Sequence, residues 1–208
     1  MPLRVVIPPS VEPVTLAEAK LHLKVDVNDD DALISSLVAT ARAHAEMITQ
    51  RSFISTMLEY VMDAFPGPSQ FGVPWGRTFS LPGHAILLPK SPVQSVESIR
   101  YLDMDGTLKT MDPATYACDL ASEPARITPA FGHIWPIPLP QIGAVMVRFI
   151  AGYGNTLADV PEGIKSWIKL RCGSLYINRE EVAILNRGIV AELPFVDGLL
   201  DPYRVVTI

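Results

Sequence analysis

The distribution of proline divides this sequence into three segments of different character. Of the 19 prolines, 12 lie between residues 51 and 158, whereas residues 14–50 hold none. Proline cannot continue a helix and is excluded from central strands, so a proline-rich segment favours short strands joined by loops. The sequence therefore predicts helices towards both ends of the chain and a β-rich segment between them.

The N-terminal segment carries two helix signals joined by an acidic turn. Thr15 and Glu18 fit a capping box, which predicts a helix over residues 15–23. Apolar residues then recur at helical spacing over residues 30–50, and the preceding Asp residues are expected to cap this helix. The turn lacks the Gly and Glu that an EF-hand requires at its sixth and twelfth positions, which argues against calcium binding.

Helical spacing returns in the C-terminal segment from residue 160. Asp159 is expected to cap this helix. One apolar stripe predicts a core-facing side, and Leu170, Gly173, Ser174 and Ile177 lie off that stripe in a second strip, of which Leu170, Gly173 and Ile177 are the candidate contacts. A helix with two such faces is either buried on all sides or contacts another chain, and the sequence leaves both possibilities open.

The middle segment contains short runs of alternating polar and apolar residues, which predict strands. These runs are TMLEYVMDAF, SVESIRYLD, TYACDL, ARITP and AVMVRFIAG. DMDG at residues 103–106 predicts a tight turn between two strands. The prolines of FPGPSQFGVPWG and WPIPLPQ predict loops.

These signals together predict an α+β fold. Neither helical end has enough apolar area to stand alone, so the two ends are expected to pack on each other. The predicted organisation is a small helical bundle built from residues 1–50 and 159–208, with a mostly antiparallel β domain inserted at residues 51–158. The helical part carries 14 acidic and 10 basic residues, whereas the insert carries 8 and 7, so the excess negative charge belongs to the helices.

Residue patterns associated with catalysis are missing from the sequence. The four histidines lack metal-ligand spacing, and there is no nucleophile elbow, phosphate loop or dinucleotide fingerprint. The two cysteines are expected to be reduced, part-buried thiols, although a lone disulfide or a nucleophile remains open. We therefore predict no catalytic, cofactor-binding or metal-binding residues and no enzyme activity. A hydrolase with the β domain as its substrate domain is the remote alternative.

Charge and hydropathy exclude further classes of protein. The net charge is −5 and no basic run is present, which disfavours sequence-specific DNA binding. No apolar run reaches the ~18 residues that span a membrane. The N-terminal MPLRVVIPPS does not resemble a signal peptide, so synthesis in the cytoplasm is expected.

Several segments taken together resemble phage head–tail connector proteins, the neck or head-completion adaptors, in a long form with a β insertion. The segments that carry the resemblance are EPVTLAEAKLHLKVD, VRFIAGYG, VPEGIKSWIKLRCGSLYINRE and LPFVDGLLDPYRV. The resemblance implies a structural virion protein of a phage, a prophage or a gene-transfer particle, made in the bacterial host cytoplasm. Such proteins form a ring of about a dozen copies at the portal vertex, which connects the DNA-filled head to the neck or tail.

The implied partners are other copies of the chain, the portal protein and the next neck or tail protein. DNA would pass through the ring without sequence-specific binding, and no membrane is involved. The second strip (Leu170, Gly173 and Ile177) is expected to contact a neighbouring subunit, with the 30–50 helix as the opposing patch. Tyr203, Arg204 and Val205 are candidate portal contacts, because related helical adaptors use their C-terminal segment there. A tail-completion or minor tail protein is the alternative role.

Overall fold

The computed structural model describes residues 3–67, 84–178 and 195–205. The chain forms two compact units, a β unit and a helical unit. The β unit comprises Met1–Pro9, Ser55–Tyr153 and Val205–Ile208, and the helical unit comprises Ser10–Ile54 and Gly154–Arg204. Helices and antiparallel sheets are both present, which confirms the predicted α+β class.

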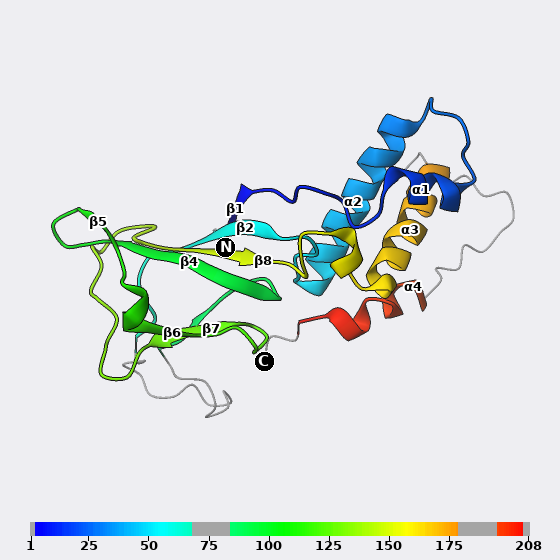
Figure 1. Ribbon diagram of the computed structural model, residues 1–208. Coiled ribbons are helices and arrows are strands. Elements are labelled where there is room, and N and C mark those ends of the chain that lie inside the picture. Colours follow the sequence, from blue (N-terminus) through cyan, green and yellow to red (C-terminus); the bar gives the residue numbers. More distant parts are fainter. Residues whose placement is uncertain (1–2, 68–83, 179–194, 206–208) are drawn as a thin grey trace, which may run out of the picture. The chain divides into compact units, whose positions relative to one another are not determined.

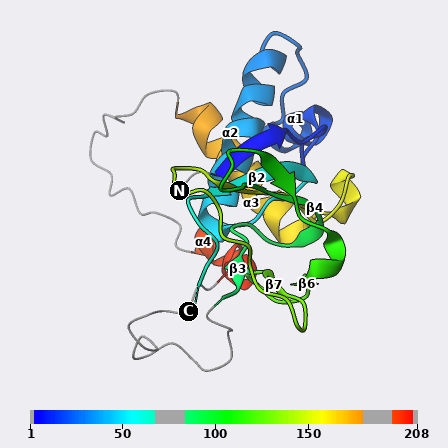
Figure 2. The ribbon, with the colours of Figure 1, turned by 90° about the vertical axis from the view of Figure 1, so that its left-hand side faces the viewer.

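The β unit contains two antiparallel sheets, drawn as separate layers in Figures 1 and 2. The five-stranded sheet has the order β1 (Leu3–Ile7), β2 (Thr56–Met62), β8 (Val145–Ala151), β4 (Val93–Leu102) and β5 (Leu108–Thr110). The three-stranded sheet has the order β3 (Ile86–Leu87), β7 (Arg126–Pro129) and β6 (Tyr116–Asp119). A short 3-10 turn, η1 (Pro113–Thr115), precedes β6.

The core of this unit lies between the two sheets. Alternate residues of β8, among them Val147 and Phe149, are fully buried, and they cluster with Ile127 of β7 and Ile86 of β3. This is the period-two pattern of a sheet with one face on a core. The predicted strands of the middle segment are confirmed, whereas β1 and β3 were not predicted.

The DMDG turn forms as predicted between β4 and β5. The backbone N–H of Gly106 donates to the carbonyl oxygen of Asp103 at 2.8 Å, and Gly106 has φ of 80°. A positive φ is readily adopted by glycine, so the residue fits the turn. The predicted loop WPIPLPQ contains neither helix nor strand, whereas the predicted loop FPGPSQFGVPWG lies outside the described residues from position 68 on.

The helical unit packs three main helices, α1 (Leu16–Leu23), α2 (Asp31–Thr49) and α3 (Glu162–Ile177), labelled in Figure 1. The described part of this unit also contains the short segments η2 (Leu157–Asp159), α4 (Phe195–Gly198) and η3 (Asp201–Tyr203). The capping box at α1 is confirmed: Glu18 N–H donates to Thr15 Oγ1 at 3.1 Å and Thr15 N–H donates to Glu18 Oε2 at 2.8 Å. The core-facing stripe of α3 is buried as predicted, including Trp167 and Cys172.

Two of the predicted caps are wrong. Asp159 does not cap α3, whose N-cap is Pro161; its carboxylate instead accepts hydrogen bonds from Thr156 N–H and Oγ1 at 2.9 and 2.8 Å within η2. Asp30 stands at the N-cap of α2 without a side-chain cap bond, and its carboxylate accepts from the hydroxyl of Tyr176 on α3. In both cases the carboxylate accepts a hydrogen bond from a donor outside the helix that it was expected to cap.

Candidate functional site

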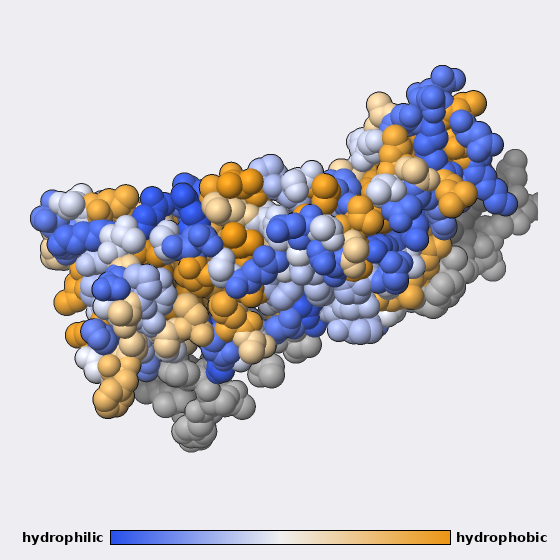
Figure 3. Space-filling view, in the orientation of Figure 1, coloured by the Kyte–Doolittle hydropathy of each residue, from blue (hydrophilic) through white to orange (hydrophobic). Residues whose placement is uncertain are grey.

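The described residues offer surfaces suited to binding proteins, and hydrophobic patches interrupt the hydrophilic surface of both units in Figure 3. No group of three or more His, Cys, Asp or Glu side chains in the described part of the chain could hold a metal ion. Among the same residues, no helix is long and apolar enough to cross a membrane. Partial desolvation raises the pKa of the thiols of exposed Cys118 and buried Cys172, which is the opposite of what a nucleophilic cysteine needs.

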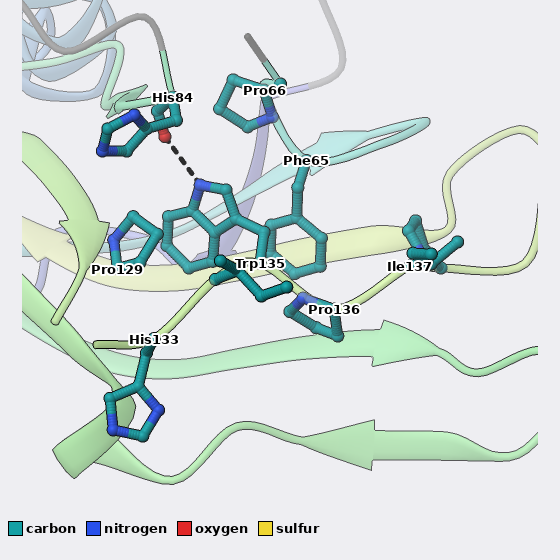
Figure 4. Close-up of a pocket in the computed structure, with 11 residues that line it drawn as sticks. Phe65, Pro66, His84, Pro129, His133, Trp135, Pro136 and Ile137 are labelled. Atoms are coloured by element: carbon teal, nitrogen blue, oxygen red, sulfur yellow. Dashed lines mark hydrogen bonds between the residues drawn. The ribbon is translucent and has the colours of Figure 1, made fainter. Parts of the chain in front are cut away.

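The first surface is an apolar loop between β7 and β8 in the β unit. Trp135 anchors this loop: its indole N–H donates to the carbonyl of His84 at 2.6 Å, and its ring stacks on Phe65 with centroids 4.9 Å apart (Figure 4). Phe65 meets Tyr101 edge to face at 5.9 Å. The aromatic stack therefore fixes the middle of a loop that has no backbone ladder of its own.

A cavity of about 530 Å³ lies beside this stack. Prolines and apolar side chains make up most of its lining, with His84 and His133 also present, as Figure 4 shows. The residues around it are unusually exposed for their type: Phe131 is fully exposed, and Ile134, Ile137 and Ile142 are 87%, 77% and 91% exposed. Contiguous exposed apolar surface typically marks an interaction site, so this loop is a candidate contact for another protein. The sequence analysis identified only a loop here.

The second surface follows α2 in the helical unit. Seven residues of this helix are exposed, and none of them is charged. They are Ala32, Leu33, Ser35, Ser36, Thr40, Ala43 and Met47. The opposite side carries the buried stripe that packs in the unit, including Ile34 and Val38. An uncharged outer face on a long helix permits close approach of another helix.

The predicted contact residues on α3 have different surroundings. Leu170 is 36% exposed and Ile177 is 78% exposed, so both remain available to a neighbouring molecule. Gly173 instead faces α1, because a Cβ placed there would lie 3.7 Å from Leu23 Cδ2 and 3.8 Å from His22 Nε2. Part of the second strip is therefore occupied by α1.

The predicted portal contacts lie in and just after η3. Tyr203 packs against the start of α3, where its hydroxyl would be 3.1 Å from a Cβ at Gly163. Arg51 Nε donates to the carbonyl oxygen of Tyr203, and Arg204 pairs with Asp201 at 3.0 Å. Gly163 and Ile177 are 14 residues apart, or about 20 Å along a helix at 1.5 Å per residue. The two sets of predicted contacts are therefore not brought together.

Comparison with known proteins gives a family match over part of the chain and a fold over all of it. Residues 13–100 match the family model of phage gp6-like head-tail connector proteins. No match is found among curated proteins. The chain is similar to one in the virion of a native gene transfer agent (GTA) particle, with a TM-score of 0.76, 24% identity, and 100% and 97% of the two chains covered.

Two neck structures are also similar over the same shares of each chain. A chain in the neck of an empty GTA particle, computed with C6 symmetry, has a TM-score of 0.74 and 24% identity. A chain in the neck of a native GTA particle, computed with C12 symmetry, has a TM-score of 0.69 and 25% identity. The likenesses at 24% identity establish the fold, and the family match confirms the resemblance to head–tail connectors that the sequence indicated.

Proposed function

We propose that this chain, a phage head–tail connector protein by its match over residues 13–100, is a structural subunit of an oligomeric ring at the neck of a virion. The ring joins the portal of the DNA-filled head to the next neck or tail component and extends the channel through which DNA passes. The observation that carries the proposal is the family match, supported by a fold shared over the whole chain with neck proteins of symmetric particles.

A closed ring requires two different patches on each subunit, joined head to tail with a rotation that closes. The uncharged outer face of α2 is one such patch, and the exposed Leu170 and Ile177 at the outer side of α3 are another. An interface of ordinary size buries ~800 Å² and about 20–30 residues on each partner, which is more residues than either patch contains. Contacts elsewhere on the subunit therefore have to contribute, and the apolar loop around Trp135 remains for the next neck component.

The C-terminal residues Tyr203, Arg204 and Val205 are the proposed portal contacts. Arg51 Nε donates to the carbonyl oxygen of Tyr203, and Tyr203 packs beside Gly163, so the position of Tyr203 in the helical unit is fixed before a partner binds. A side chain that is already ordered loses less entropy when it binds a partner.

The acidic balance of the chain suits a DNA conduit. The formal charge is −5, and a channel that attracted phosphates strongly would retard the sliding duplex. We expect a lumen that is neutral or acidic and makes no sequence-specific contact with DNA.

The test is the mass of the protein in solution, measured by light scattering alone and after addition of the portal protein. We expect a portal-bound assembly of about a dozen copies, in keeping with the C12 symmetry of the similar neck. Electron micrographs of particles lacking the protein give the second readout. Filled heads that lose their DNA support the neck role, whereas heads that keep their DNA beside long or untidy tails would indicate a tail-completion role.

A further inference from the structure

An ion cluster lies on the face of the five-stranded sheet that points away from the β unit's core. Leu58 and Val147 point into the core, so their neighbours in sequence, Glu59 on β2 and Arg148 on β8, occupy the opposite face. Glu59 Oε1 accepts hydrogen bonds from Arg148 Nη2 at 2.9 Å and from Arg100 Nη2 on β4 at 2.8 Å. Three neighbouring strands thus contribute to one cluster.

The cluster holds more positive than negative charge. A single carboxylate, whose side chain is only 12% exposed, serves two guanidinium groups that are 26% and 33% exposed. Arg4 stands opposite Glu59 in the β1–β2 register and adds a third positive charge, while Glu97, bonded to Ser95, adds a second negative one. Three arginines against two glutamates leave an excess of one positive charge on an acidic protein.

The guanidinium groups have unused donors. Each offers five N–H bonds, and the recorded hydrogen bonds use one nitrogen of each, Nη2. The Nε atoms of Arg100 and Arg148 are buried and lack a partner among the described residues. These buried Nε atoms are out of reach of an incoming group, so the donors that it meets are the remaining Nη N–H bonds of the partly exposed guanidinium groups. Glu59 holds both side chains in place, so these donors are already ordered.

The surroundings of the cluster favour a protein over a nucleic acid. Met57, Met146 and Ile150 are half-buried and occupy the same sheet face as the arginines. Arginine and methionine side chains next to apolar residues are typical of protein–protein interfaces. A phosphate backbone would instead require a row of cations without carboxylates among them.

The acidic turn between α1 and α2 has the complementary chemistry. Asp30 and Asp31 are already engaged, by Tyr176 and by Lys20 respectively. Asp26 and Asp29 are exposed, and no hydrogen bond or ion pair is recorded for their side chains within the part of the chain that the structure describes. They flank Val27, which is 60% exposed. The tip of the turn therefore presents two carboxylates around one apolar side chain.

We propose that the sheet face around Arg100 and Arg148 receives the 26–29 turn of a neighbouring copy of the chain. Asp26 and Asp29 pair with the two arginines, and Val27 packs on Met146 and Ile150. The two surfaces differ, so the contact is heterologous and can repeat around a ring. This inference rests on the proposed ring and names a contact that the helical patches alone do not supply.

Disulfide cross-linking on the portal tests the contact directly. Copies carrying Val27→Cys are mixed with copies carrying Met146→Cys, both with Cys118→Ser to remove the exposed thiol, and oxidised after addition of the portal. The control pair replaces Val27→Cys with Leu21→Cys, a position on α1 that is also exposed. We expect mixed dimers from the Val27 pair at least about tenfold faster than from the control pair. Equal rates in a ring of the correct mass would overturn the contact and leave the proposed function standing.

Charge exchange gives the second test. Asp26→Lys with Asp29→Lys leaves the β unit untouched and is expected to weaken assembly about tenfold or more, with a strong dependence on salt. Arg148→Glu should weaken assembly similarly, and combining it with the two lysine substitutions should restore part of the loss. Arg148→Gln serves if the glutamate variant unfolds. Lysine variants that assemble like the wild type would refute the proposal.

Duplex DNA is the other molecule that could bind the sheet face around Arg100 and Arg148, so its binding is also tested. Fluorescence anisotropy with a short labelled duplex should show no binding that depends on Arg100 or Arg148. Duplex binding that Arg100→Gln with Arg148→Gln abolishes would assign the face to the DNA channel instead. Failure of the wild-type protein to assemble on the portal at all would count against the proposed function itself.

Discussion

The helical unit makes a sharp prediction at Gly173, which lies four residues before the end of α3 and faces α1. Glycine inside a helix costs about 0.5–1 kcal/mol relative to alanine, because it loses more backbone entropy on folding. A Cβ at this position would meet Leu23 at 3.7 Å and His22 at 3.8 Å, which are ordinary contact distances. Gly173→Ala is therefore expected to raise the free energy of unfolding by about 1 kcal/mol.

Urea unfolding followed by far-ultraviolet circular dichroism measures this change from the transition midpoint at constant slope. Gly173→Leu is the matched control, since its larger side chain would push against α1 and cost about 1–3 kcal/mol through overpacking. If Gly173→Ala destabilises the protein instead, α1 packs on this glycine more closely than 3.7 Å and leaves no room for a Cβ. Gly173→Ala also shows whether this glycine contacts α1 or a neighbouring subunit. Ring assembly should be unchanged because α1 already covers Gly173, whereas Ile177→Asp should impair assembly.

Three further predictions concern other parts of the molecule. A Cβ at Gly154 would lie 2.2 Å from Asp159 Oδ2, so Gly154→Ala should break the η2 capping box and lower the free energy of unfolding by about 1 kcal/mol. Adding Asp159→Ala should lower it little further, and fully additive losses in urea unfolding would contradict this. Phe131→Ser and Ile134→Ser change exposed side chains, so thermal unfolding should show a stability within about 0.5 kcal/mol of the wild type. Binding of the next neck component should fall, and retained binding would show that the loop is not the contact. Hydrogen bonds from Ser122 and Arg126 lower the pKa of Asp119 to about 2, so its contribution to stability is present above the unfolded pKa of 3.8 and is lost as the pH falls through about 2. Asp119→Asn should therefore make the free energy of unfolding depend less on pH across that range, and an unchanged pH dependence would refute the link.

Local signals in the sequence located most of the secondary structure. The Thr15–Glu18 capping box and the helical spacing of α2 act within a few residues, so they can be read without knowing the fold. The DMDG turn is equally local, since Gly106 supplies the positive φ that the hairpin needs. The misassigned caps show the limit of such reasoning. Asp30 has cap chemistry, but the partner that takes its carboxylate is Tyr176, a residue 146 positions away.

The candidate surfaces depended more heavily on the three-dimensional structure. Proline content predicted that WPIPLPQ is a loop, but only the structure shows that Trp135 stacks on Phe65 while the neighbouring isoleucines are exposed. The second strip on α3 was visible as a pattern, but only the packing shows that Gly173 is covered by α1 while Ile177 is not. A sequence pattern shows that a face is apolar and cannot show what covers it.

The sequence by itself determined the α+β class, the helices with their local caps, and the resemblance to connector proteins, because period, capping and turn chemistry are properties of neighbouring residues. Only the tertiary structure brought Glu59, Arg100 and Arg148 together and paired β1 with β2. In the ion cluster, Glu59 lies 41 positions from Arg100 and 89 positions from Arg148. Strand pairing over such separations is selected by the packing of the whole sheet, which a local sequence pattern does not contain.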